Sequence, residues 1–380
     1  MNIRLRNLVL LFACLALAAC GPGSESQQPQ PDAQEQIAEP TNEEQPAEEE
    51  AGEIQEPVSA EREEPELNNL PIGDDFITTS GPAVGYVWMC QEQNSGSGSE
   101  NTGDWYDEAA GVWDFTSKPV VDGSVNWDSE INISVQGNTR HIEANGLPHH
   151  ATGNYPIASS DDAYQFDTNP HSLESQSFTL DLPANPTYQE NPTCVRGEVG
   201  ISINGVVINN PVDAVGRDAV ATEIQDLCQG HPHTGGVYHY HGYSFCLEDQ
   251  EAQGHSALIG YSLDGFGIYG IYGENGEVMT NEDLDICHGH THEIDWDGET
   301  VEMFHFHATI EFPYLIGCHR AEPETFTDAI QANESGSEQS GGQGQGNGQP
   351  PADGGQPPQG EGNNPPPQGE GNNPPPGGGN

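Results

Sequence analysis

The chain has 380 residues, with 61 acidic and 8 basic side chains, and its formal net charge is −53. This balance excludes proteins that bind nucleic acid or anionic lipid by neutralising phosphates with basic side chains. Hydrophobic residues make up 33% of the chain. An ordinary globular domain has roughly 45–50% on a count that also includes Gly, and the lower share suggests that part of the chain does not fold.

Residues 1–19 predict a lipoprotein signal peptide. Arg4 and Arg6 precede an apolar run at residues 8–17, which is too short to span a bilayer as a stable helix. The following residues resemble a bacterial lipobox, Leu17-Ala18-Ala19-Cys20. The resemblance implies that Cys20 is lipidated and that Gly21 directs the protein to the outer membrane of a Gram-negative bacterium. The alternative is an ordinary cleaved signal with an incidental cysteine.

Two arms of biased composition flank the central block. Residues 20–70 carry 15 acidic side chains and predict a disordered tether, because they cannot bury enough apolar surface to offset the loss of chain entropy. Residues 332–380 are rich in Gly, Pro and Gln and lack the glycine at every third position that collagen needs. They predict a disordered tail.

Residues 71–331 predict one β-dominated domain with a short helix. Asn-Gly and Asp-Gly pairs between apolar runs are typical of hairpin turns, and they occur at residues 204–205, 275–276 and 297–298. Further strands are expected at residues 84–89, 124–135, 139–144 and 177–182. The helix is expected to begin at Asp213 or Gly216 and to end at Leu227, with an apolar stripe that includes Leu227.

The folded block carries 41 acidic and 5 basic side chains. A domain with this net charge of −36 repels itself, and the repulsion is smallest where salt screens it, so the charge predicts a saline habitat. Calcium binding by the acids is the alternative. Its local signal is the segment 295–299, where an Asp-Gly pair favours a hairpin turn instead.

Six cysteines remain in the folded block: Cys90, Cys194, Cys228, Cys246, Cys287 and Cys318. An even number in an exported protein predicts three disulfides, and fifteen pairings are open to them. We favour the pairs 228–246 and 287–318, because each closes a loop that carries histidines, and the pair 90–194 remains. Thiolate metal ligation is the alternative, although the chain has no Cys-x-x-Cys spacing.

Eight of the 15 histidines form four His-x-His pairs within the His-rich part, residues 211–320. The arrangement is duplicated. Each copy of the motif contains, in order, a cysteine, Gly-His-x-His, aromatic-His-aromatic-His and a second cysteine. The pairs are His231/His233 with His239/His241 in the first copy, and His290/His292 with His305/His307 in the second.

Strand geometry brings the members of a pair together. Residues i and i+2 of a strand point to the same face, so His239 and His241 project together while Tyr238 and Tyr240 face the other way. The pair His305/His307 follows the same rule against two phenylalanines. We predict that these two strand pairs hold a transition metal, with Cu or Zn as the metal and the other two pairs completing that site or a second one. The alternative is a metal-free core of hydrogen-bonded imidazoles.

Other polar residues are weaker candidates. His255 and His288 are reserve ligands or second-layer groups, and His149, His150 and His171 are expected in solvated turns. Asp264, Asp218 or Glu293 is a candidate general base, with Arg217 as an anion clamp; Arg217 and Asp218 instead fit the cap of the short helix. The five tryptophans, at positions 88, 105, 113, 127 and 296, are expected in the core rather than on a glycan-stacking surface.

The combined motifs resemble the YHYH domain family of exported bacterial and some eukaryotic proteins. The resemblance rests on Tyr238-His239-Tyr240-His241, on the Gly-His-x-His segments 230–233 and 289–292, and on residues 264–270. It covers roughly residues 84–320. Membership of this family implies no particular activity, because none is assigned to it. In the second copy of the motif, at residues 304–307, phenylalanines replace the tyrosines of the first.

The sequence therefore predicts an exported, lipid-anchored envelope protein with a His-rich domain that binds a transition metal. It names no reaction. The alternative is a metal-free binding module for glycan or cell-envelope contact. Expected partners are the membrane, through the lipid anchor, and a small molecule or an envelope polysaccharide; no nucleic acid and no oligomer are expected.

Overall fold

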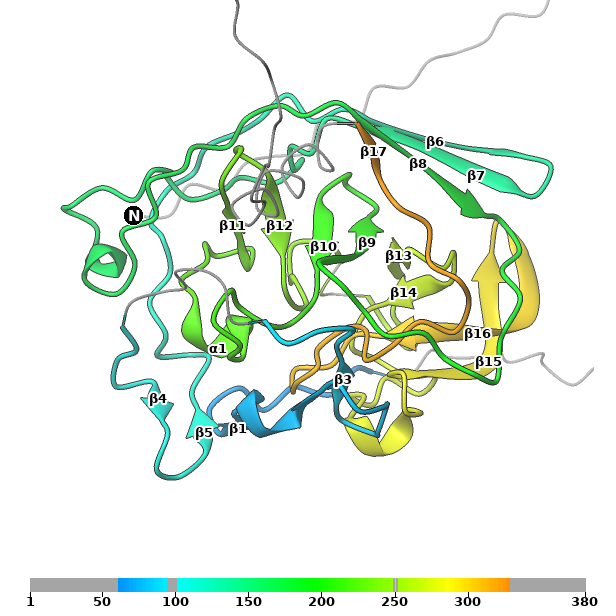
Figure 1. Cartoon of the computed structure of the whole chain (residues 1–380), viewed down its shortest axis with the longest axis horizontal. Coiled ribbons are helices and arrows are strands. Elements are labelled where there is room, and N and C mark those ends of the chain that lie inside the picture. The colour runs from blue at the N-terminus through cyan, green and yellow to red at the C-terminus, as the bar shows by residue number, and fades with distance from the viewer. Residues whose placement is uncertain (1–60, 94–100, 249, 251, 329–380) are drawn as a thin grey trace, which may run out of the picture. The chain divides into compact units, whose positions relative to one another are not determined.

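The computed structural model describes residues 61–93, 101–248, 250 and 252–328 (Figure 1). The predicted signal peptide with Cys20, most of the predicted tether and the predicted tail lie outside these residues. Within the described residues, no helix has the length and apolar character needed to cross a membrane. Residues just before position 71 pack on the domain, since Arg62 Nη2 lies 2.6 Å from a carboxylate oxygen of Glu248.

The described residues are strand-dominated, and this confirms the predicted fold class. The central element is an eight-stranded sheet, whose strands Figure 1 shows in succession. In spatial order they are β11 (Gly230–Pro232), β12 (Tyr238–Tyr240), β10 (Val207–Asn209), β9 (Glu198–Ser202), β13 (Leu258–Ser262), β14 (Gly267–Tyr269), β16 (Glu299–His307) and β15 (Gly289–Trp296).

Three smaller sheets and short helical turns complete the described structure. The four-stranded sheet has the order β17 (Thr327–Asp328), β8 (Phe178–Pro183), β7 (Thr139–Ala144) and β6 (Ile131–Gln136). The others are β1 (Leu70–Pro71), β5 (Val112–Trp113) and β4 (Tyr106–Asp107), and the pair β2 (Ile77–Thr78) and β3 (Val87–Trp88). The helical elements are α1 (Ala219–Thr222) and the 3₁₀ turns Asp74–Phe76, Asp162–Gln165 and Asn281–Asp283.

The eight-stranded sheet consists of two repeats related by an approximate two-fold axis. At its centre β9 pairs antiparallel with β13, and Ile201 lies opposite Tyr261, with Gly200 opposite Ser262 and Ser202 opposite Gly260. Outward from the centre, β10 and β14 pair parallel with β12 and β16, which in turn pair antiparallel with β11 and β15. The duplication of the histidine motif therefore includes the strands that precede it.

Side chains on the two faces of this sheet belong to two different clusters of buried apolar residues. Tyr238 of β12 and Phe306 of β16 pack on one side. Ile201 and Tyr261 pack on the other side, together with Leu180 of β8. Because side chains alternate along a strand, the histidines between the aromatic residues of β12 and β16 point to the side of the sheet that carries β8.

The predicted hairpin at residues 297–298 is confirmed. Trp296 pairs with Glu299 across β15 and β16, and the two turn residues have positive φ angles of 55° at Asp297 and 84° at Gly298, as a type I′ turn requires. The Asn204-Gly205 pair likewise connects β9 to β10. The segment 295–299 is therefore a turn, as favoured over a calcium loop.

The predicted helix is mostly wrong. Only Ala219–Thr222 is helical, capped by the Asp218 carboxylate, which accepts hydrogen bonds from the backbone N–H groups of Val220 and Ala221. Side chains also contact its carbonyl groups: Lys118 donates to Val220 O, and Gln225 donates to Ala219 O, which also accepts from the Glu223 N–H group. The chain then becomes extended at Glu223, and Leu227, expected on the buried stripe, is 75% exposed.

The structure contains the three favoured disulfides, Cys90–Cys194, Cys228–Cys246 and Cys287–Cys318. The second and third occupy matching places in the two repeats. Each connects the segment before a Gly-His-x-His motif to the segment after the aromatic-His-aromatic-His strand. All six cysteines are therefore unable to act as thiolate ligands.

The close approach of the two central strands yields a stability prediction. A Cβ atom at Gly200 would lie 2.6 Å from the Tyr261 carbonyl oxygen, and one at the matching Gly260 would lie 2.7 Å from the Ile201 carbonyl oxygen. Overpacking of this kind costs about 1–3 kcal/mol. We expect Gly200→Ala to lower the free energy of unfolding by that amount in urea denaturation, and Thr291→Ala on the exposed face of β15 to change it by less than about 0.5 kcal/mol. An unchanged midpoint for Gly200→Ala would contradict the central pairing.

Candidate metal centres

The first candidate centre, site one, consists of His231, His239 and His241. His239 and His241 lie two residues apart on β12 and its end, and His231 of β11 pairs directly with His239. One ring nitrogen from each lies within 4.8 Å of the others. All three residues are buried, with 3–6% of their surface exposed.

Backbone carbonyl groups determine which nitrogen of each strand imidazole carries the proton. The Nδ1 atoms of His239 and His241 lie 3.2 Å from Val237 O and 2.5 Å from Asn210 O. A carbonyl oxygen only accepts, so both Nδ1 atoms donate. In the neutral rings both Nε2 atoms are then unprotonated, and they face one another at 3.1 Å.

The second candidate centre, site two, consists of five imidazoles in the second repeat. One ligand atom from each lies within 4.8 Å of all the others, and the members are His255, His290, His292, His305 and His307. His305 and His307 are fully buried, whereas the other three are half-buried. Site two therefore has solvent access that site one lacks.

Site two has the same carbonyl-directed arrangement. His305 and His307 donate from Nδ1 to Met303 O at 3.0 Å and Gly270 O at 2.6 Å, as their counterparts do in site one. His255 donates from Nδ1 to Ser256 O at 2.7 Å. The unprotonated Nε2 atoms of His255 and His307 face one another at 3.1 Å.

The hypothesis of one site shared by both strand pairs is wrong. Five strand-to-strand steps separate β12 from β16 in the sheet, which amounts to roughly 24 Å at the usual spacing. The pairs belong instead to two separate groups. The physical reason is the sheet order, which places the repeats on opposite sides of the central β9 and β13 pair.

Burial keeps most of these imidazoles neutral. Burial and the neighbouring imidazoles lower the pKa of His290 to about 4, and burial lowers the pKa of His305 to about 2 although its bond to Met303 O opposes the shift. Burial also lowers the pKa of His239 and His307 well below the usual value. At neutral pH these rings therefore offer lone pairs, the form that ligates metals.

Glu223 also faces site one, and sequence reasoning did not single it out. Its Oε2 atom lies 3.3 Å from the Nε2 atoms of both His231 and His241. Burial raises the pKa of Glu223 and the two facing imidazoles lower it, to a net value of about 2. The pKa of His231 is raised overall. Burial lowers it, but the facing Glu223 carboxylate raises it by more. No spacing in the sequence relates Glu223 to the histidine motif.

Several polar atoms in both sites lack hydrogen-bond partners among the described residues. They are Glu223 Oε2, both ring nitrogens of His231, and His292 Nε2. An unpaired buried polar atom is costly, and such atoms together with carbonyl-anchored imidazoles are what a metal centre requires. The side chains of both sites therefore fit a transition metal.

The predicted histidine His233 lies at the edge of site one. Its ring centroid is 4.8 Å from that of His239, and its Nδ1 donates to Thr234 O at 2.6 Å. It is not a member of the convergent group. Its counterpart His292 belongs to site two. His255, expected as a reserve group, also lies among the converging nitrogens of site two.

The tyrosines of β12 support site one from the opposite face. The Tyr238 hydroxyl donates to the Asp226 carboxylate at 2.9 Å. The Tyr240 hydroxyl is contacted by Asn204 at 3.0 Å and by His150 Nε2 at 2.5 Å. The expectation that His150 is solvated is therefore wrong, because this contact holds its ring half-buried; His149 is exposed and His171 is half-buried.

The other predicted candidates lie outside the two sites. Asp264 accepts backbone hydrogen bonds from Arg320 and Ala321. Arg217 pairs with Asp213, and Asp218 caps α1, as favoured over a catalytic role. Glu293 is exposed on β15. His288 is buried and faces the Thr309 hydroxyl at 3.0 Å.

The tryptophans are buried or half-buried. Trp105, Trp113 and Trp296 are buried in the core, as expected, and Trp88 and Trp127 are half-buried.

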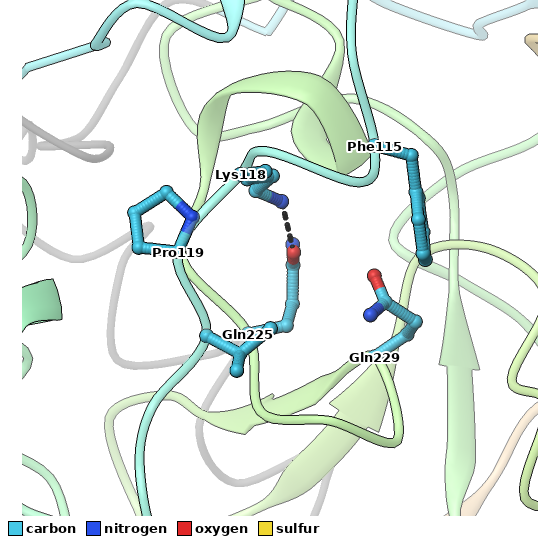
Figure 2. Close-up of a pocket in the computed structure, with 6 residues that line it drawn as sticks. Phe115, Lys118, Pro119, Gln225 and Gln229 are labelled. Atoms are coloured by element: carbon cyan, nitrogen blue, oxygen red, sulfur yellow. Dashed lines mark hydrogen bonds between the residues drawn. The ribbon is translucent and has the colours of Figure 1, made fainter. Parts of the chain in front are cut away.

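Figure 2 shows a small pocket in which Lys118 is directed at Gln225. Burial lowers the pKa of Lys118 to about 7. The pocket is lined by Phe115, Lys118, Pro119, Val120, Gln225 and Gln229.

A third group of ligand-type residues combines His150 with Cys228 and Cys246. The two cysteines are bonded to one another. A disulfide sulfur is not the thiolate that binds metals. Sites one and two are thus the candidate centres within the described residues.

Part of the chain is similar to a known protein family. The model of the family described as YHYH protein matches residues 179–281. No curated protein and no solved structure matches the chain. The matched segment includes all of site one and only His255 of site two, and it is shorter than the expected span of residues 84–320. The resemblance predicted from the sequence is therefore confirmed for residues 179–281, the segment that contains the Tyr-His-Tyr-His strand.

Proposed function

We propose that this protein binds transition metal ions at two separate centres, site one and site two, with one centre in each repeat of the sheet. The observation that carries the proposal is the pairing of Nε2 atoms. The pairs His239/His241 and His255/His307 each face one another at 3.1 Å while their Nδ1 protons are donated to backbone carbonyl groups.

Two facing lone pairs repel one another unless a cation lies between them. A proton would place an imidazolium in a buried position, and burial lowers the pKa of His239 and His307 well below the usual value. A metal ion fits the separation of the two Nε2 atoms better than a proton does. With metal–nitrogen distances near 2.05 Å, two ligands lie about 2.9 Å apart at a right angle and about 3.3 Å apart at the tetrahedral angle.

The donor set favours Cu(II) at site two. Imidazole ligands suit Zn, Cu, Ni and Fe, and Cu(II) binds such donors most tightly among the divalent ions of the series. Protein zinc sites closed by side chains almost always have four ligands, whereas site two offers five imidazoles. The three disulfides agree with an oxidising compartment, in which copper is present as Cu(II).

We further propose that the protein is a lipoprotein of the outer membrane, exported through residues 1–19 and anchored through Cys20. The proposal is supported by the charged start, the short apolar run and the small residues before the cysteine. The long acidic tether would then present the metal-binding domain away from the membrane surface.

Metal content tests the two proposed centres. The chain from residue 21 onward is produced without a histidine tag, dialysed, and titrated with Cu(II) or Zn(II) by calorimetry and mass spectrometry. We expect two equivalents in the wild type, one in His239→Ala/His241→Ala, one in His305→Ala/His307→Ala and none when all four substitutions are combined. At a free metal concentration 100-fold above the Kd, each site should add about 2.7 kcal/mol of stability.

The exposed His149→Ala variant is the matched control, and we expect it to retain both equivalents. A wild-type protein that binds no metal and gains no thermal stability from Cu(II) or Zn(II) would contradict the proposal. That result would favour the metal-free interaction module instead.

Fatty-acid labelling tests the proposed anchor at Cys20. In a Gram-negative host, the wild type should incorporate an alkyne-labelled fatty acid and fractionate with outer membranes, whereas Cys20→Ala should do neither. Cys14→Ala, which changes the other cysteine of the signal segment, should behave like the wild type. Fatty-acid labelling that survives Cys20→Ala would disprove the lipobox assignment.

A further inference from the structure

We propose that Glu223 is a fourth ligand of site one, so that the two repeats hold metal ions with different donor sets. Site one then combines three imidazoles with one carboxylate and is closed, whereas site two uses imidazoles alone and remains open. This inference rests on the proposed function and adds a ligand, a coordination geometry and an exchange behaviour to it.

The local fold directs Glu223 at the histidines. Glu223 is the residue at which α1 ends and the chain becomes extended. Its side chain is 12% exposed, and those of His231 and His241 are 8% and 7% exposed. The Oε2 atom accepts no hydrogen bond from any described residue, although it is buried beside two imidazoles.

Three of the distances in site one are close to tetrahedral edge lengths, although Glu223 lies outside the group of His231, His239 and His241 whose ligand atoms converge within 4.8 Å, so its carboxylate must move towards His239 when a metal binds. Oε2 lies 3.3 Å from His231 Nε2 and 3.3 Å from His241 Nε2, and His241 Nε2 lies 3.1 Å from His239 Nε2. Ligand atoms placed about 2.0–2.1 Å from a central ion at tetrahedral angles are separated by about 3.3 Å. In the neutral ring His241 Nε2 carries a lone pair, and a metal ion bound between it and the anionic oxygen would remove their repulsion.

The two repeats fill the extra ligand position from unrelated parts of the chain. In site one the extra group is Glu223, at the end of α1. In site two it is His255, which precedes β13 and faces His307, the counterpart of His241. The duplication therefore reproduces the strand histidines, and the loops select the additional donor. A carboxylate with three imidazoles and a four-ligand geometry favours Zn(II) at site one.

The difference in burial predicts different rates of metal release from the two sites. The side chains of site one are almost fully covered, whereas three imidazoles of site two are half-buried. We therefore infer that a chelator removes metal quickly from site two and slowly from site one. Replacing Glu223 by glutamine should accelerate the slow phase alone, because it removes the anionic ligand and preserves the side-chain volume.

The test loads the chain from residue 21 onward with Zn(II) and follows its release to excess EDTA with a colorimetric zinc indicator. We expect two phases of equal amplitude in the wild type. Glu223→Gln should accelerate the slow phase by at least tenfold and leave the fast phase unchanged. Glu302→Gln, an exposed substitution on β16, is the matched control and should retain both wild-type rates.

Two equivalents with unchanged rates in Glu223→Gln would overturn the inference and leave the proposed function standing. A wild type that binds no zinc and no copper would overturn both, so the two failures are distinguishable. A second measurement applies if Glu223→Gln does not fold. In His305→Ala/His307→Ala loaded with Co(II), added azide should leave the visible spectrum unchanged, because Glu223 fills the fourth position; an azide-dependent shift would overturn the inference.

Discussion

The hydrogen bonds from imidazole Nδ1 atoms to backbone carbonyl groups are the constraint on which the two centres depend. Asn210 O and Gly270 O occupy matching positions after β10 and β14 and accept protons from His241 and His307. Each bond orients its ring and leaves Nε2 unprotonated. The parallel pairing of β10 with β12 and of β14 with β16 brings these carbonyl groups to the histidines. Strand pairing, tautomer and ligand direction thus have a common cause.

Duplication explains why there are two centres, and the sheet order explains why they are separate. The approximate two-fold axis between Ile201 and Tyr261 places the ligand strands β12 and β16 on opposite sides of the central pair. The aromatic residues opposite the histidines differ between repeats. Tyr238 donates to Asp226, whereas Phe304 has no hydroxyl and the matching Asp285 accepts from Arg320 instead. Both arrangements give the carboxylate a partner, and the carboxylate is buried at Asp226 and half-buried at Asp285.

Local rules predicted the features that depend on neighbouring residues. The alternation of side chains placed His239 and His241 on one face, the Asp-Gly pair identified the turn at 297–298, and the cysteines around each histidine loop indicated its disulfide. The remaining errors concern relations between distant segments. The end of α1 depends on Lys118, which donates to the Val220 carbonyl group that a longer helix would use. The separation of the strand pairs and the positions of Glu223 and His255 depend on sheet order and loop paths, which leave no periodic signal in the sequence.

The central claim is that each repeat binds its own metal ion between nitrogen atoms that already converge. Anomalous X-ray diffraction from crystals loaded with Zn(II) or Cu(II), measured on both sides of the metal absorption edge, tests this claim most directly. The account predicts two peaks, one among His231, His239 and His241 and one among the five imidazoles of site two, separated by roughly 24 Å. A single peak bridging the repeats, or none at the histidines with hydrogen-bonded water in their place, would contradict it.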